Sequence, residues 1–422
     1  MIKPSSLSEW ILILFGVALA VPEALSNSYS YGLLYVGSFP VYACEVVLLG
    51  VVGIAAAKVA QTGTWINRNT GAISLILISY VGSMIVVGVL GGNTERAIQD
   101  TRLLYAPLVV VSFEQIFRGK ISKSRSVLLC SAIVVISSVV VVLLSSILYW
   151  TGAGTSELSR NEIINYSLYR NIKVGVAFLT CFAWVKYSLH KNTRYLALAG
   201  LVITLLFHLS YQEGGVGNYI WVLMALGITS VATINYLHGS VRRKTWHRMI
   251  LTVGLLTALL WLIGGFEWLT DPVNEFQSTT SLYANNRVRL SQMAYAVDRI
   301  MESPVFGHGA AETYELQLSG AFRQAGAAIE RPADSTFLSV GADYGVFGLI
   351  LYLSLGISGV INTTYKGKTK SQALYIKEIL IATQCTIIVV MILGQLFGTI
   401  GLAGRVSAMQ YGVVLAITDA VE

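Results

Sequence analysis

Charged residues are scarce in this sequence. Only 12% of its 422 residues are Asp, Glu, Lys or Arg, which is about half the level of an ordinary soluble domain. The hydrophobic share is 55%, and the mean hydropathy is +0.66. This composition excludes a typical soluble globular domain, and the repeated long apolar runs indicate an integral membrane protein.

Cysteine is also rare, and the spacing of metal-binding motifs is missing. The four cysteines all fall inside apolar runs, and no two of them form a C-x-x-C pair. This pattern argues against a disulfide framework and a zinc site, and it predicts small core residues instead. We expect no metal and no cofactor. The cysteines are Cys44, Cys130, Cys181 and Cys385.

Apolar runs occupy most of the chain and leave no room for a separate soluble domain. We predict an all-α integral membrane protein, a single polytopic domain over residues 1–422 with about twelve transmembrane helices. The first run also resembles a signal peptide, but the alternation of loops described below is complete when it is retained. The runs cover 10–25, 41–59, 71–90, 103–117, 126–150, 171–189, 195–210, 219–237, 249–269, 336–361, 377–398 and 405–420.

Basic residues predict the orientation of these runs. The net charge is +7, and 18 of the 29 lysines and arginines fall in every second connection. The positive-inside rule places those connections and both termini in the cytoplasm. The basicity is therefore a topology signal, and we expect no nucleic-acid partner. The 18 residues are Lys3, Lys58, Arg68, Arg118, Lys120, Lys123, Arg125, Lys186, Lys191, Arg194, Arg242, Arg243, Lys244, Arg248, Lys366, Lys368, Lys370 and Lys377.

The outer side uses arginine almost exclusively. Of its 11 basic residues, ten are arginines. Arginine presents a planar fork of donors that suits phosphate, whereas lysine is a point charge. An anionic, phosphate-bearing ligand is one interpretation, and ordinary surface charge is the other. The residues are Arg96, Arg102, Arg160, Arg170, Lys173, Arg287, Arg289, Arg299, Arg323, Arg331 and Arg405.

One connection, over 271–335, is much longer than the others and lies on the outer side. Structureless loops longer than about 12–15 residues are uncommon and are often functional. Within "NNRVRLSQMAYAVDRIMESPVFGHGAA", apolar residues recur every three or four positions from Arg289 to Met301. This spacing predicts an amphipathic helix at the membrane surface. Pro304 ends the helix, and Gly307 and Gly309 allow the backbone to turn.

The tenth run begins with "ERPADSTFLSVGADYGVFGLILYL". Arg331 and Asp334 stand at its outer mouth, and Asp343 lies deeper. A carboxylate at that depth is expensive in lipid, so we expect Asp343 to face protein or water. Asp334 can cap the helix or act in chemistry, and the two roles are compatible.

Together these two stretches resemble the core of the O-antigen ligase / Wzy-type polysaccharide polymerase superfamily. Its members are bacterial inner-membrane glycosyltransferases of about a dozen spans. Their long periplasmic loop has an arginine, a Pro-x-x-Gly-x-Gly turn and a polar pair that enters a helix with Gly-x-x-Gly. The matching residues are Arg289, Pro304, Gly307, Gly309, Asp334, Ser335, Gly345 and Gly348.

Two departures from the family pattern affect the functional prediction. Ligases carry His-Asn where this chain has Asp334-Ser335, which favours a polymerase over a ligase. Many members also carry Ser-Arg-Gly at the outer end of a middle span. The corresponding stretch here, "HLSYQEGGVGNYIW", contains Glu213 and no arginine. Another outer arginine can supply that charge; the candidates are Arg102, Arg160, Arg170 and Arg405.

The resemblance implies a metal-independent glycosyltransferase whose active site faces the periplasm. Its donor is a glycan on undecaprenyl pyrophosphate, and its acceptor is a second lipid-linked glycan or, in a ligase, the lipid A-core of lipopolysaccharide. Membrane lipids and a chain-length regulator are further expected partners. Asp334 is the candidate for positioning or deprotonating the acceptor hydroxyl, with Glu213 and His308 as further candidates. The predicted pyrophosphate ligands are Arg287, Arg289, Arg331, Arg102 and Arg405.

A transporter, such as a lipid-linked oligosaccharide flippase, is the competing class. A two-halves carrier is expected to show six-plus-six repetition and often a long central inner loop. The central connection here spans only His190–Arg194, and the longest loop is outside. This asymmetry favours an enzyme acting at the outer face. A non-catalytic assembly subunit is a third possibility, in which single outer arginines would be replaceable.

Overall fold

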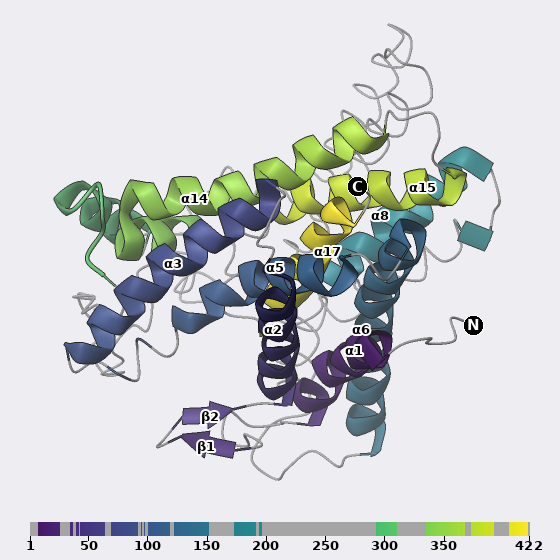
Figure 1. The fold of residues 1–422 in the computed structure, drawn as a ribbon, viewed down its shortest axis with the longest axis horizontal. Coiled ribbons are helices and arrows are strands. Elements are labelled where there is room, and N and C mark those ends of the chain that lie inside the picture. The colour runs from purple at the N-terminus through teal and green to yellow at the C-terminus, as the bar shows by residue number, and fades with distance from the viewer. Residues whose placement is uncertain are drawn as a thin grey trace, which may run out of the picture.

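The computed structural model is helical over nearly all of the chain that it describes (Figure 1). A helix at 293–302 leads into a turn, and one short antiparallel hairpin pairs β1 (Leu34–Val36) with β2 (Phe39–Val41). The described residues are 7–25, 34–36, 39–41, 43–63, 69–91, 94, 97, 100–118, 122–151, 173–190, 194–195, 293–309, 335–367, 373–391 and 405–420.

The helix boundaries follow the apolar runs closely. The remaining runs, at 195–210, 219–237 and 249–269, lie outside the described residues, apart from residue 195. The helices are α1 (Leu7–Leu25), α2 (Ala43–Thr62), α3 (Asn69–Leu90), η1 (Thr101–Leu104), α5 (Tyr105–Phe117), α6 (Lys123–Thr151), α8 (Lys173–His190), α14 (Thr336–Gly367), α15 (Leu374–Val389) and α17 (Arg405–Asp419).

Four of these helices contain segments long and apolar enough to cross a membrane. They are Cys44–Thr62, Asn69–Leu90, Lys123–Val140 and Thr336–Tyr365. A helix needs roughly 20 apolar residues to span the hydrocarbon core. The prediction of an all-α, membrane-embedded protein is therefore confirmed in its general form. The count of twelve spans and their orientation stay predictions.

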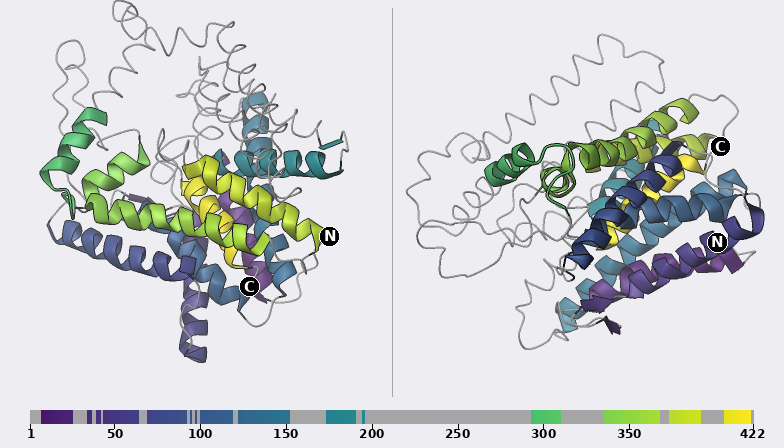
Figure 2. Two further views of the ribbon diagram at one scale, coloured as in Figure 1. Left: turned by 90° about the horizontal axis from the view of Figure 1, so that it is seen from above. Right: turned by 60° about the vertical axis from the view of Figure 1, so that its left-hand side comes forward.

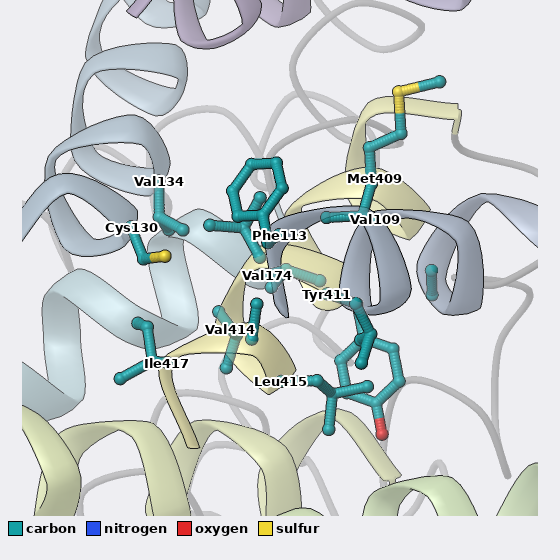
Figure 3. Close-up of a cluster of buried hydrophobic side chains, with 14 of the residues drawn as sticks. Val109, Phe113, Cys130, Val134, Val174, Met409, Tyr411, Val414, Leu415 and Ile417 are labelled. Atoms are coloured by element: carbon teal, nitrogen blue, oxygen red, sulfur yellow. The ribbon is translucent and has the colours of Figure 1, made fainter. Parts of the chain in front are cut away.

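Helix α17 forms the centre of the described bundle. Every residue from Val406 to Asp419 is buried. Figure 3 shows Phe113 of α5, Cys130 and Val134 of α6 and Val174 of α8 gathered around α17. A helix that is buried all round must be covered by neighbouring segments on every side.

Helices α3 and α14 lie side by side, as Figure 1 and both views of Figure 2 show. Their contact includes a polar pair, since the Asn362 amide donates to the Thr70 hydroxyl at 2.9 Å. Tyr80 meets Phe347 edge-on with ring centroids 5.0 Å apart. The two helices therefore run antiparallel along much of their length.

Polar contacts between helices join their ends in a regular way. Arg125 at the start of α6 pairs with Glu9 at the start of α1, and Lys58 near the end of α2 donates to a carbonyl near the end of α5. Lys186 and His190 near the end of α8 pair with Glu378 near the start of α15. These pairings fit helices that alternate up and down along the chain.

Candidate functional site

Several predicted site residues lie outside the described residues, and the others fall into two groups. One group is the turn with Pro304, Gly307, His308 and Gly309; the other contains the two arginines Arg102 and Arg405. The predicted site residues outside the described part are Arg287, Arg289, Arg331, Asp334 and Glu213.

The turn closes directly after the helix at 293–302. The N–H of Gly307 donates to the carbonyl of Ser303 at 3.0 Å, and the Ser303 hydroxyl donates to the carbonyl of Gly307 at 2.7 Å. Gly307 and Gly309 have positive φ angles of 71° and 94°. The predicted helix stop at Pro304 and the glycine turn after it are both confirmed.

This turn is bonded to an interruption in α14. Gly345 has φ 66° and ψ −175°, so the helix breaks there and resumes after it. Four backbone hydrogen bonds cross between residues 304–309 and 342–347; we call this unit the glycine clamp. They run from His308 N–H to Ala342 O (3.0 Å), Gly309 N–H to Asp343 O (2.8 Å), Val346 N–H to Pro304 O (2.8 Å) and Phe347 N–H to Val305 O (3.3 Å).

Glycine is required at both centres of the clamp. A Cβ on Gly345 would lie 2.2 Å from the Val305 oxygen, and a Cβ on Gly307 would lie 2.4 Å from the Gly345 nitrogen. Both residues also have the left-handed φ that side chains disfavour. The two glycines therefore allow the turn and the broken helix to approach at backbone distance.

Tyr80 of α3 supports the clamp from a third element. Its hydroxyl donates to the Tyr344 carbonyl at 2.9 Å, with the Phe306 carbonyl at 3.5 Å. Because the helix breaks at Gly345, carbonyls in the preceding turn lack the backbone donors of a continuous helix. The Tyr80 hydroxyl supplies a donor to one of them, the carbonyl of Tyr344. Sequence reasoning missed Tyr80, because a tyrosine within an apolar run carries no signal of such a contact.

His308 is held by the helix that precedes it. Its Nε2 is 2.9 Å from the Arg299 carbonyl oxygen, and the guanidinium of Arg299 pairs with Glu302 at 2.6 Å. His308 Nε2 also lies 3.7 Å from the Glu302 carboxylate. The ring is thus partly buried and fixed in place.

The second group joins four polar residues from four elements. Arg405, at the start of α17, pairs with Glu45 of α2 at 3.1 Å. Tyr105, at the start of α5, donates a short hydrogen bond to the same Glu45 oxygen, and Arg102 in η1 lies close enough to interact electrostatically with Tyr105. We call these residues the Glu45 cluster. It holds two arginines and one carboxylate, so any anion bound by Arg405 must compete with Glu45.

The start of α14 is capped by Ser335. Its hydroxyl lies 3.4 Å from the N–H of Leu338, which donates to it. Capping of the first turn is a common role of serine at this position. The predicted cap, Asp334, lies outside the described residues, so the described cap is one residue further on. Asp343, eight residues further along the chain, is buried, in agreement with the expectation that it faces protein or water.

The described residues contain no group of three or more His, Cys, Asp or Glu side chains that can hold a metal ion. The ionisable side chains described beside the clamp are Arg299, Glu302 and His308. Neither a scan of protein-family models nor a search of curated proteins returns a match for this chain.

Proposed function

We propose that this chain is a bacterial inner-membrane glycosyltransferase that polymerises undecaprenyl-pyrophosphate-linked repeat units of O-antigen or exopolysaccharide at the periplasmic face. One observation carries the proposal. The Pro304–Gly309 turn and the glycine-containing start of α14 are separate parts of the family-like pattern, and the glycine clamp makes them one unit. A pattern of weak motifs is more specific when its parts are in contact.

Orientation is part of the proposal. The starts of α2, α5 and α17 meet in the Glu45 cluster, and the positive-inside rule assigns all three starts to the periplasmic side. The pairs Glu9–Arg125 and Lys186–Glu378 join ends that the same rule assigns to the cytoplasm. The contacts between helices are thus consistent with an outer face that carries the long loop and the Glu45 cluster.

The proposed reaction needs charge neutralisation and alignment of two lipid-linked glycans. Arg287 and Arg289 bind the pyrophosphate, because charge-assisted hydrogen bonds to phosphate contribute about 1.5–3 kcal/mol each. The acceptor hydroxyl oxygen bonds to the anomeric carbon, and the bond from that carbon to the pyrophosphate oxygen breaks. The hydroxyl proton passes to the carboxylate of Asp334. Arg331, Arg102 and Arg405 add positive charge at the same face.

Polysaccharide profiling tests this proposal. A strain lacking the gene is complemented with wild type, Arg289→Ala, Asp334→Ala or, as a matched control, Arg323→Ala, and surface polysaccharide is separated on gels. We expect both site variants to leave single repeat units on the lipid A-core, while Arg323→Ala restores long chains.

The other outcomes distinguish the alternatives. Long chains that stay on undecaprenyl pyrophosphate would identify a ligase. A normal profile from both site variants would remove Arg289 and Asp334 from the site. A normal profile in the strain without the gene would favour a transporter of lipid-linked oligosaccharide or another function.

A further inference from the structure

The glycine clamp contacts α3 at the middle of that helix, which is long and apolar enough to span a membrane. Tyr80, which donates to the clamp, is ten residues from Leu90 at the end of the 22-residue helix α3. At 1.5 Å per residue, that end is about 15 Å from the level of Tyr80. Because the hydrocarbon core is about 30 Å thick, this distance is roughly half its depth.

Helix α14 folds back at the break, because Phe337 packs against Tyr352 with ring centroids 6.4 Å apart and the Leu349 side chain lies 3.8 Å from a Cβ built on Gly341. The residues before Gly345 therefore lie alongside those that follow it, and the break is the tip of this hairpin. The turn at 303–309 is bonded to that tip, at the level of Tyr80 and below the end of α3.

The surroundings of the turn are apolar and exposed. Phe306 is 61% exposed and Met301 is 74% exposed, and Val297 and Val305 continue the same surface. On the neighbouring helix α3, Leu90 is 82% exposed, and Val86 and Val87 are exposed too. Large apolar side chains are thus exposed both on the turn and on the last turns of α3, and hydrocarbon is the environment that suits them.

Polar backbone groups of the turn are hydrogen-bonded to α14, as an apolar environment requires. Irregular backbone at membrane depth is tolerated only where protein or a water-filled cavity satisfies its polar groups. In the clamp, N–H groups of His308 and Gly309 donate to α14, and carbonyls of Pro304 and Val305 accept from α14. The turn and the helix break therefore satisfy each other's backbone groups.

Polar side chains of the segment occupy another edge. Arg299 is paired with Glu302, and His308 is bonded to the Arg299 carbonyl. Ionisable groups at membrane depth are expected to be paired or to face a water-filled cavity. The segment thus has an apolar edge, a polar edge that also carries the exposed Asp298, and a third edge packed on α14, where Ile300 meets Gly341.

We infer that residues 293–309 form a re-entrant segment, whose turn is inserted among the lipid acyl chains next to α3 and α14. This inference replaces the expectation that the amphipathic helix lies on the membrane surface. It requires that α3 and α14 cross the bilayer, and it is independent of the proposed enzymatic reaction.

Spin-label depth measurements test the inference. The full chain is reconstituted in phosphatidylcholine and phosphatidylglycerol nanodiscs with a nitroxide on Phe306→Cys or, in a second variant, Val305→Cys. Accessibility to oxygen, which enters hydrocarbon, is compared with accessibility to a water-soluble nickel chelate. Ile76→Cys, near the middle of α3, and Leu90→Cys, at its end, provide deep and shallow references; both side chains are exposed. The four native cysteines are buried, and unmutated protein is the labelling control.

The expected result is an oxygen-to-nickel ratio at Phe306 and Val305 close to that of Ile76 and at least several-fold above that of Leu90. A ratio at both turn positions equal to or below that of Leu90 would place the turn at the aqueous surface and overturn the inference. A nitroxide on Glu302→Cys, at the polar edge of the segment, is expected to be more accessible to the nickel chelate than a nitroxide on Phe306→Cys. Loss of glycosyltransferase activity plays no part in this test, so the two proposals fail separately.

Discussion

At the scale of single residues, Gly345 decides whether the turn and α14 can meet. Its φ of 66° is left-handed, and the Val305 oxygen occupies the space of a side chain. No rotation of a side chain relieves this contact, because the opposing atom belongs to the backbone. The residue is thus constrained both by its own conformation and by its neighbour.

Gly345→Ala is therefore expected to destabilise the protein by about 2 kcal/mol or more, from the left-handed backbone and the clash together. The measurement is the thermal midpoint of detergent-purified protein, followed by fluorescence-detected size exclusion. Gly53→Ala on the exposed side of α2 is the control, since no atom lies within 4 Å of its Cβ position. Equal midpoints for the two variants would show that the clamp does not contribute to stability.

A second prediction concerns the Glu45 cluster. The side chains of Arg405 and Glu45 are only 13% and 10% exposed, so removing one charge leaves the other poorly solvated. In a cycle of Glu45→Gln, Arg405→Gln and the double variant, we expect a coupling energy of about 1–3 kcal/mol. Unfolding in denaturant measures it.

The pair Arg299–Glu302, in which Arg299 is 17% exposed and Glu302 is 55% exposed, supplies a more exposed comparison for this cycle. Glu302 is exposed, and coupling in such pairs is typically about 0.2–1 kcal/mol. A coupling for Glu45 and Arg405 no larger than the control would mean that their ion pair is weak. Arg405 would then be available to a pyrophosphate without competition.

At the scale of elements, α17 and α5 approach one another through Gly412. A Cβ at this position would lie 2.6 Å from the Ala106 carbonyl and 2.8 Å from the Val109 Cβ. Small residues allow helix backbones to pack closely in membranes, where packing is a major source of association energy. The position of α17 therefore depends on the absence of a side chain at residue 412.

Gly412→Val is expected to separate α17 from α5 and to lower the thermal midpoint by several degrees, with a cost of about 1–3 kcal/mol from overpacking. Gly82→Val on α3 is the control, because nothing lies within 4 Å of its Cβ position. An unchanged midpoint for Gly412→Val would mean that the two helices adjust without cost.

The elements show what the sequence can and cannot predict. The boundaries of α2, α3 and α6 lie within three residues of the ends of the predicted apolar runs. The agreement is expected because the thickness of the hydrocarbon core sets the length of the apolar run in a spanning helix. The break in α14 was missed, since Gly-x-x-Gly within an apolar run also fits an unbroken helix. The clamp consists of backbone hydrogen bonds, which depend on residue type only through its glycines.

At the scale of the whole molecule, the alternation of basic loops predicts which surfaces face the cytoplasm. Single cysteines at Gln61 and Gly91, exposed at opposite ends of the α2–α3 region, test it. In spheroplasts, a membrane-impermeant maleimide is expected to label Gly91→Cys directly and Gln61→Cys only after permeabilisation. The reverse pattern would invert the topology and place the clamp on the cytoplasmic half.

Candidate site residues were predictable to different degrees. The turn at Pro304 and the burial of Asp343 followed from helix-stop chemistry and from the cost of a carboxylate in lipid. The sequence does not predict the pairing of Arg405 with Glu45, because which residues meet across such a separation depends on how the helices pack. Arg289 and Asp334, which carry the proposed chemistry, remain predictions that the polysaccharide profile tests.

The enclosed position of α17 has a consequence for biogenesis. Its neighbours α5 and α6 leave the ribosome long before it, by roughly 15–60 s at 5–20 residues per second. During that interval the place of α17 must be kept open or filled by lipid. Ser137 and Ser138 of α6, which later meet Gln410, also donate to the carbonyl of Val134 in their own helix. The early helices can thus wait in the bilayer with these hydroxyls satisfied, and α17 completes the bundle when it is inserted.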